Sequence, residues 1–88
     1  MENKTKQLIQ ERAKDYGNPK TTFKIISDLW NSYLRNVKNI DTELKPSDVS
    51  NLMALLKLGR NLKKNKDDNI DDMIAYIEIT KYLKKLKL

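Results

Sequence analysis

Apolar residues recur every three or four positions along most of this 88-residue chain, and that period decides what the chain can fold into. The spacing matches one turn of an α-helix, and no stretch alternates apolar and polar residues long enough to predict a strand. Only two glycines and two prolines interrupt it, too few turn residues for a β-sandwich. We therefore expect an all-α protein, with residues 1–88 forming a single helical domain.

Four helices are predicted, separated by breaks at glycine, proline and polar residues. Their approximate ranges are 3–15, 20–37, 46–63 and 67–87. Together they predict a compact four-helix domain. The third helix is apolar around much of its circumference, so it should be central or should also face another chain. Because a core this small is marginal by itself, we also expect a homo-oligomer.

Each of the last three helices has a predicted buried stripe. The stripes comprise Phe23, Ile26, Trp30, Tyr33 and Val37 in the second helix, Val49, Leu52, Met53, Leu56 and Gly59 in the third, and Ile70, Met73, Ile74, Tyr76, Ile77 and Leu83 in the fourth. A glycine inside a helix costs about 1 kcal/mol relative to alanine. Gly59 therefore predicts the close approach of another backbone or of a ligand.

The absence of cysteine and histidine excludes several kinds of chemistry. Disulfides, thiol nucleophiles, Ser–His–Asp triads and imidazole or thiolate metal sites all need one of these residues. A metal ion would have to be held by carboxylate oxygens. No apolar run approaches the roughly 18–20 residues of a membrane span, and the N-terminus has no apolar signal region. We expect a soluble, cytoplasmic protein with no membrane partner.

The charge is positive and unevenly distributed. Eighteen Lys and Arg against twelve Asp and Glu give a net charge of +6. Residues 57–66 contain five cations and no acid, residues 67–72 contain four aspartates, and residues 81–88 contain four lysines. This balance favours anionic partners, namely nucleotides, nucleic acid or an acidic protein. The alternative for the C-terminal lysines is a solvated surface, and nucleic-acid binding through residues 81–87 stays open.

The first candidate site residues lie where the first predicted helix ends. Arg12 and Tyr16 are four residues apart and so share a helix face, and Asn18 follows in the turn. A guanidinium beside an aromatic ring can hold a phosphate while the ring stacks on a base. The alternative is an arginine packed on a tyrosine for stability.

The other candidates lie on the third and fourth helices. Lys57 and Arg60 share one face, and two adjacent cations repel unless an anion or carboxylates lie between them. Asp68, Asp72 and Tyr76 share a face of the last helix. The two carboxylates can hold Mg²⁺, or they can neutralise the two cations across a helix pair. The predicted ligand-binding set is thus Arg12, Tyr16, Asn18, Lys57, Arg60, Asp68, Asp72 and Tyr76, with no catalytic residue and no metal ligand assigned.

Taken in order, these residues resemble a family of small phage and prophage proteins of unassigned function over about residues 8–80. The resemblance rests on Arg12, Tyr16-Gly17-Asn18-Pro19, Phe23, Leu29-Trp30, Tyr33-Leu34, Pro46-x-Asp48-Val49, Leu52-Met53, Leu55-Leu56-Lys57, Arg60, Asp68-Asn69-x-x-Asp72 and Tyr76. More distantly, the arrangement is similar to the all-α MazG-like nucleotide pyrophosphohydrolases. Those enzymes hold Mg²⁺ with Glu-x-x-Glu on one helix and Glu-x-x-Asp on the next, and this sequence contains no Glu-x-x-Glu.

The resemblance implies a phage-encoded nucleotide-binding protein that acts in the cytoplasm of the infected host. Because half of the metal cage is missing, we expect binding without turnover and no cofactor, with a nucleotide signal of host immunity as the molecule sequestered. One alternative is a Mg²⁺-dependent pyrophosphohydrolase that uses Asp68, Asp71 and Asp72 with Asp15 or Glu11. Another is a protein-binding inhibitor of a host defence complex, such as an anti-CRISPR. If the pocket lies between protomers, Arg12 and Tyr16 of one chain complete a site begun by Lys57 and Arg60 of another.

Overall fold

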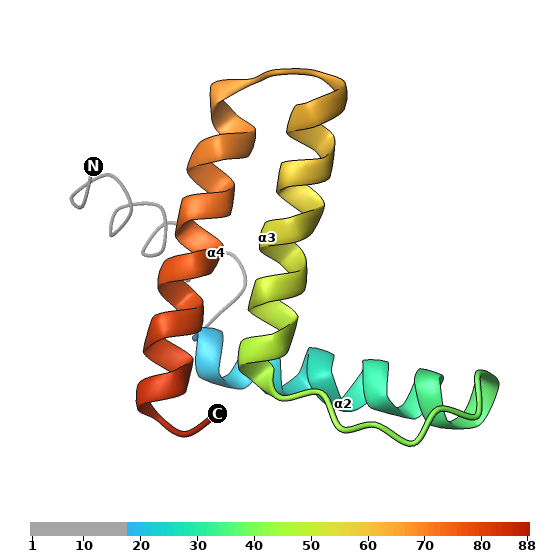
Figure 1. The fold of residues 1–88 in the computed structure, drawn as a ribbon. Helices are drawn as coiled ribbons and strands as arrows, with labels where there is room; N and C mark the ends of the chain where they lie inside the picture. The colour runs from blue at the N-terminus through green and yellow to red at the C-terminus, as the bar shows by residue number, and fades with distance from the viewer. Residues whose placement is uncertain (1–17) are drawn as a thin grey trace.

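The computed structural model describes residues 18–88, and these form three α-helices and no strand (Figure 1). The helices are α2 (Pro19–Val37), α3 (Pro46–Lys63) and α4 (Asp67–Lys85). The all-α prediction is confirmed for this part of the chain, which contains three of the four predicted helices. The predicted helix over residues 3–15 lies outside the described residues.

Each helix begins at residues suited to a helix N-terminus. The Asn18 side chain accepts a hydrogen bond from the backbone N–H of Lys20 at 2.9 Å, and Pro19 occupies the first helical position. Pro46 opens α3, and the Asp48 carboxylate accepts from the backbone N–H of Lys45 at 2.8 Å. The first turn of α4 contains aspartates, whose negative charge favours a helix N-terminus. These signals explain why the predicted helix boundaries agree with the structure.

The three described helices form an L (Figure 1), and the compact four-helix domain stays a prediction because its first helix lies outside the described residues. Figure 1 shows α3 and α4 side by side as an antiparallel hairpin, with α2 lying across its base. The C-terminal part of α2 and the connection 38–45 extend away from the hairpin. The inner angle of the L, between this arm and α3, is therefore not filled by another described helix.

The hydrophobic core lies where the three helices meet. Phe23, Val49, Ile79 and Leu83 form the buried cluster, and Ile26, Trp30, Met53, Tyr76 and Leu88 pack around it. Val49 and Leu83 have no exposed surface. This small core fixes the base of the hairpin on the first half of α2.

Small residues let α3 and α4 approach closely, and two of them pair their hydroxyl groups. The buried residues between these helices include Ser50 and Ala54 on α3 and Ala75 and Thr80 on α4. The Ser50 and Thr80 hydroxyl oxygens are 2.5 Å apart, and Thr80 Oγ1 lies 3.0 Å from Asn51 Oδ1. Since buried hydroxyls are costly unless hydrogen-bonded, this pairing allows a polar contact inside the hairpin.

Several side chains predicted to be buried are exposed instead. They are Tyr33, Val37, Leu52, Leu56 and Ile77, with exposed fractions of 40–57%. The stripe predictions were wrong for these residues. Each helix has an apolar arc that is wider than the part that one neighbouring helix can cover, so the rest of the arc stays exposed. On α2 the buried edge includes Ser27 and Asn31, next to the apolar arc. The close approach predicted at Gly59 is also absent within the described chain, because an added Cβ would meet nothing within 4 Å.

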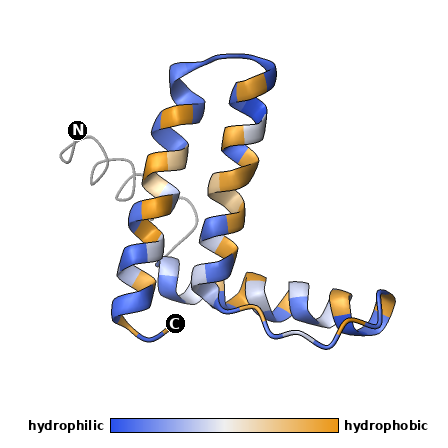
Figure 2. Cartoon of the chain, in the orientation of Figure 1, coloured by the Kyte–Doolittle hydropathy of each residue, from blue (hydrophilic) through white to orange (hydrophobic). Residues whose placement is uncertain are grey.

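Hydrophobic and hydrophilic residues recur within successive turns of every described helix, as Figure 2 shows. This is the pattern of helices that bury one face and solvate the other. No helix between residues 18 and 88 has the length and apolarity that crossing a membrane requires.

Asn31 joins the arm of the L to the chain that follows it. Its amide nitrogen donates to the Leu44 carbonyl at 3.0 Å, and its carbonyl accepts from the Leu44 N–H at 2.7 Å. We expect Asn31→Ala to lower the free energy of unfolding by about 1–3 kcal/mol, because it leaves both backbone groups unpaired. Urea denaturation measures the loss, and amide exchange at Leu44 should accelerate.

The matched control is Asn36→Ala on the same helix. Asn36 is exposed, and its amide nitrogen donates to the carbonyl and hydroxyl oxygens of Ser32, one turn earlier in α2. Its removal should change the stability by less than about 0.5 kcal/mol. Equal losses in the two variants would contradict a special role for the Asn31–Leu44 pair.

Candidate functional site

An ion pair between α3 and α4 lies at the centre of the predicted site. Lys57 Nζ is 3.0 Å from Asp72 Oδ2, and the two side chains are only 15% and 16% exposed. Opposite charges at this distance attract strongly when little water surrounds them. The prediction that the aspartates neutralise a cation across a helix pair is confirmed for Lys57 and Asp72.

Tyr76 follows Asp72 by one turn of α4 and supplies an aromatic ring on the same side of the helix. Its ring contacts Phe23 of α2 edge to face, with centroids 6.3 Å apart and an angle of 80° between the planes. Tyr76 is half-buried. The contact holds the tyrosine where α4 meets α2.

Arg60 and Asp68 flank the ion pair on the side of the connection 64–66. Arg60 lies one turn beyond Lys57 on α3, and Asp68 lies one turn before Asp72 on α4. Both side chains are exposed, and neither forms an ion pair within residues 18–88. Of the two cations that the aspartates could neutralise, Lys57 is thus the one that pairs with an aspartate within residues 18–88.

The remaining predicted residues have different outcomes. Asn18 uses its side-chain oxygen to cap α2, which is a structural role. Arg12 and Tyr16 lie outside the described residues, so their part in the site stays a prediction.

The acidic residues at the start of α4 do not gather into a metal site by themselves. Across residues 18–88, no three Asp or Glu side chains are grouped so that they could hold a metal ion. The pyrophosphohydrolase alternative would therefore need Glu11 or Asp15, which lie outside this part of the chain.

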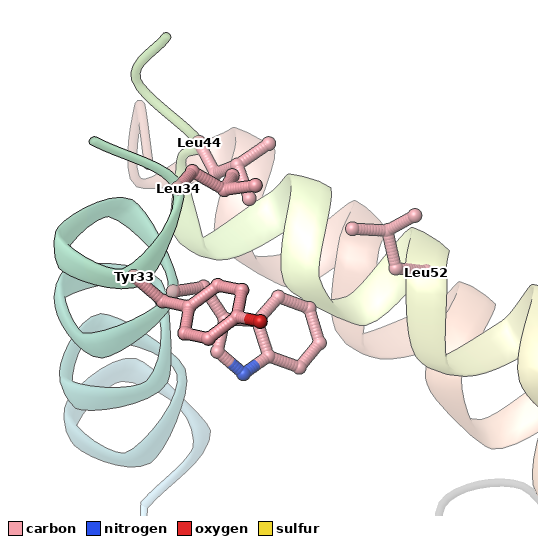
Figure 3. Close-up of a pocket in the computed structure, with 5 residues that line it drawn as sticks. Tyr33, Leu34, Leu44 and Leu52 are labelled. Atoms are coloured by element: carbon pink, nitrogen blue, oxygen red, sulfur yellow. The ribbon is translucent and has the colours of Figure 1, made fainter. Parts of the chain in front are cut away.

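Two pockets lined by described residues were not anticipated from the sequence. The first, of about 500 Å³, lies in the inner angle of the L and is lined by Trp30, Tyr33, Leu34, Leu44 and Leu52 (Figure 3). The signal for it was the width of the apolar arcs on α2 and α3. Neither pocket includes any residue of the predicted ligand-binding set.

The second pocket, of about 410 Å³, lies between the start of α3 and the end of the chain. Its lining consists of Lys45, Ser47, Asp48, Lys84, Lys87 and Leu88. The three lysines would suit an anion. However, the donor groups of Ser47 at the start of α3, which could also bind an anion, already have an acceptor. The Ser47 N–H and hydroxyl both donate to the Leu88 carbonyl, at 3.3 and 3.1 Å.

Fold and site together define a small helical protein whose two long helices are bridged by a mostly buried Lys–Asp pair. Comparison with protein families then identifies the family: the chain belongs to DUF6378, a domain of unknown function, whose family model matches residues 1–84. No solved structure matches the chain.

Two curated relatives come from mycobacteriophages. The chain is 34% identical to the gene 55 protein of Mycobacterium phage L5 over 79 residues, which covers 89% of this chain and 46% of that protein. It is 37% identical to the gene 55 protein of Mycobacterium phage D29 over 60 residues, 68% of this chain and 36% of that protein. The chain thus spans less than half the length of these relatives. A family of unknown function with phage members is confirmed, and the likeness to MazG-like enzymes stays a prediction.

Proposed function

We propose that this protein binds a nucleotide between α3 and α4 and holds it without chemical turnover. The observation that supports the proposal is the Lys57–Asp72 pair, whose side chains are 15% and 16% exposed. Replacing such a pair with apolar residues is often neutral or stabilising, so stability alone does not explain why these helices contain it. A ligand phosphate would give Lys57 a second acceptor.

Each residue around the pair has a role in this proposal. Arg60, which has no acidic partner within residues 18–88, adds a fork of donors suited to phosphate oxygens. Tyr76 offers the ring against which a base stacks. Asp68 and Asp72 accept hydrogen bonds from ribose hydroxyls or base amino groups. Arg12 and Tyr16, which lie outside the described residues, are proposed to complete the site.

The phage relatives suggest where such binding would be useful. A nucleotide-binding protein that does not turn its ligand over lowers the free concentration of that ligand in proportion to its own abundance. We propose that in the infected host's cytoplasm the ligand is a nucleotide signal of host immunity, and that sequestering it counters host defence.

Isothermal titration calorimetry against linear and cyclic nucleotides tests the proposal, with inorganic phosphate as a further ligand. We expect at least one nucleotide to bind, and Arg60→Glu to weaken it at least ~10-fold, about 1.4 kcal/mol. Arg35→Glu, an exposed arginine on α2, is the control with the same charge change. It should leave the affinity within about twofold, less than half a kcal/mol.

Three outcomes would contradict the proposal. The first is silence across the panel at about 100 μM ligand, and the second is an equal loss of affinity in the two variants. The third concerns turnover: release of pyrophosphate when nucleotide triphosphates are incubated with Mg²⁺ would replace sequestration by hydrolysis.

A further inference from the structure

A wide apolar surface in the inner angle of the L is not covered by any other part of residues 18–88. Trp30, Tyr33 and Leu52 line one pocket, so the exposed stripes of α2 and α3 meet there (Figure 3). We name this surface the apolar corner, and its exposed members are Tyr33, Val37, Leu52, Leu55, Leu56 and Leu62, at 40–79% exposure. Apolar patches larger than a few hundred Å² on a protein surface mark interaction sites.

The spacing on α3 indicates a helical partner. Leu52, Leu55, Gly59 and Leu62 follow one another at intervals of three, four and three residues. This is the spacing of a helix seam that packs against another helix. The seam lies away from α4, because α3 turns Val49, Ser50 and Ala54 into the hairpin.

Gly59 is an independent sign that another chain approaches this seam. Its place in the interior of α3 costs about 1 kcal/mol relative to alanine. Nothing described in the chain makes use of the space, since a Cβ added there meets no atom within 4 Å. A glycine between Leu55 and Leu62 would let a partner backbone pack closely against the seam.

The charges of the corner favour a second copy of the same chain. The six exposed members include no ionised side chain, and the nearby Lys57 is turned towards α4 and paired with Asp72. Exposed Lys63, four residues after Gly59, places a cation at the C-terminal end of this face and not at its centre. An acidic partner would be recognised by cations at the centre of the apolar corner. A two-fold pairing brings the same patch of both copies together, and an apolar patch can meet itself without burying like charges at the centre of the interface.

The size of the corner also suits a dimer. A half-exposed large apolar side chain offers on the order of 100 Å², so the six members offer roughly 600 Å² of the about 800 Å² that each partner contributes to a stable interface. We propose that a second copy of this chain covers the apolar corner, forming a two-fold homodimer through α3 and the C-terminal half of α2.

The test is the solution mass of the nucleotide-free chain, measured by sedimentation over a concentration series. We expect about 21 kDa, twice the 10.3 kDa of one chain. Trp30 is the single tryptophan and lines the corner, so its fluorescence should shift towards the blue as the dimer forms. Higher salt should strengthen the dimer, because screening reduces the repulsion between two copies of charge +6.

Variants locate the interface. Leu55→Glu should weaken dimerisation at least ~100-fold, because it buries an unpaired charge in the interface. Leu55 is 60% exposed in the single chain, so this variant should fold, and circular dichroism checks its helix content. Ile77→Glu changes an exposed residue of α4 that is 45% exposed and outside the corner, and it should dimerise normally.

Gly59→Ala tests the two effects attributed to this glycine, namely the lower stability of α3 and the close approach of the partner backbone. We expect the alanine to stabilise α3 while weakening the dimer at least ~10-fold, because a methyl group then occupies the space of the partner backbone. A chain that stays monomeric throughout the series overturns the proposal. So does a dimer that Leu55→Glu leaves intact, or one that both glutamate variants weaken equally.

Discussion

Lys57→Met is expected to lower the free energy of unfolding by about 2–3 kcal/mol, because it removes one partner of an ion pair that is largely shielded from water. The carboxylate of Asp72 would remain in the seam between α3 and α4, where its side chain is 16% exposed. Asp72→Leu should cost a similar amount, because it leaves Lys57 charged at 15% exposure. Urea denaturation followed by circular dichroism measures both losses.

The double variant Lys57→Met with Asp72→Leu should recover most of this stability. Neither charge then remains in the seam, and apolar residues of similar volume often replace such a pair at no net cost. The coupling free energy from the double-mutant cycle should therefore exceed about 2 kcal/mol. A double variant as unstable as the sum of the two single variants would show that the pair is not the interaction being broken.

The same double variant separates stability from binding. If nucleotide binding uses Lys57 and Asp72, the double variant should be folded and yet lose its affinity for the nucleotide that the unmodified chain binds. Full affinity in the folded double variant would place the ligand elsewhere.

Leu83→Ala should destabilise the protein by about 2–5 kcal/mol. Leu83 has no exposed surface and lies in the cluster that joins all three helices, so its truncation leaves a cavity against Phe23, Val49 and Ile79. Thermal unfolding and urea denaturation should both show the loss. Leu86→Ala, at a position 41% exposed on the same end of the chain, should cost less than about 1 kcal/mol. Equal effects at the two positions would be inconsistent with this core.

The helix boundaries were predictable because local residues determine them. Asn18 with Pro19, Pro46, and the aspartates that open α4 act within one turn of the chain, so their effect does not depend on the tertiary fold. The pairing of Lys57 with Asp72 was also open to prediction, as one of two stated alternatives. Lys57 lies among apolar residues of its helix, and Asp72 lies one turn before Tyr76 on the next helix, so the sequence offered each charge a possible partner.

The faces that the helices bury were harder to predict. Apolar periodicity measures how wide an arc is, but not which part of it a neighbour covers. In α3 the contact with α4 uses Ser50 and Ala54 because small residues permit close packing, and this leaves Leu52 and Leu55 outside. The serines and alanine at positions 47, 50 and 54 were the signal in the sequence that pointed to the true contact face.

The wide apolar arcs of α2 and α3 indicated an exposed apolar surface, but the position of the pocket in the inner angle could not be derived from spacing. Its walls come from α2, the connection 38–45 and α3, so its existence depends on the angle at which α2 crosses the hairpin. That angle follows from contacts such as the Asn31–Leu44 hydrogen bonds, which join residues thirteen positions apart. No pattern within one helix encodes it.

The short link between α3 and α4 has a consequence for the order of folding. Only residues 64–66 separate these two helices, whereas residues 38–45 separate α2 from α3. Closing the shorter loop costs less entropy, and contacts that are near in sequence form fastest. The hairpin is therefore expected to assemble first and α2 to dock onto it afterwards.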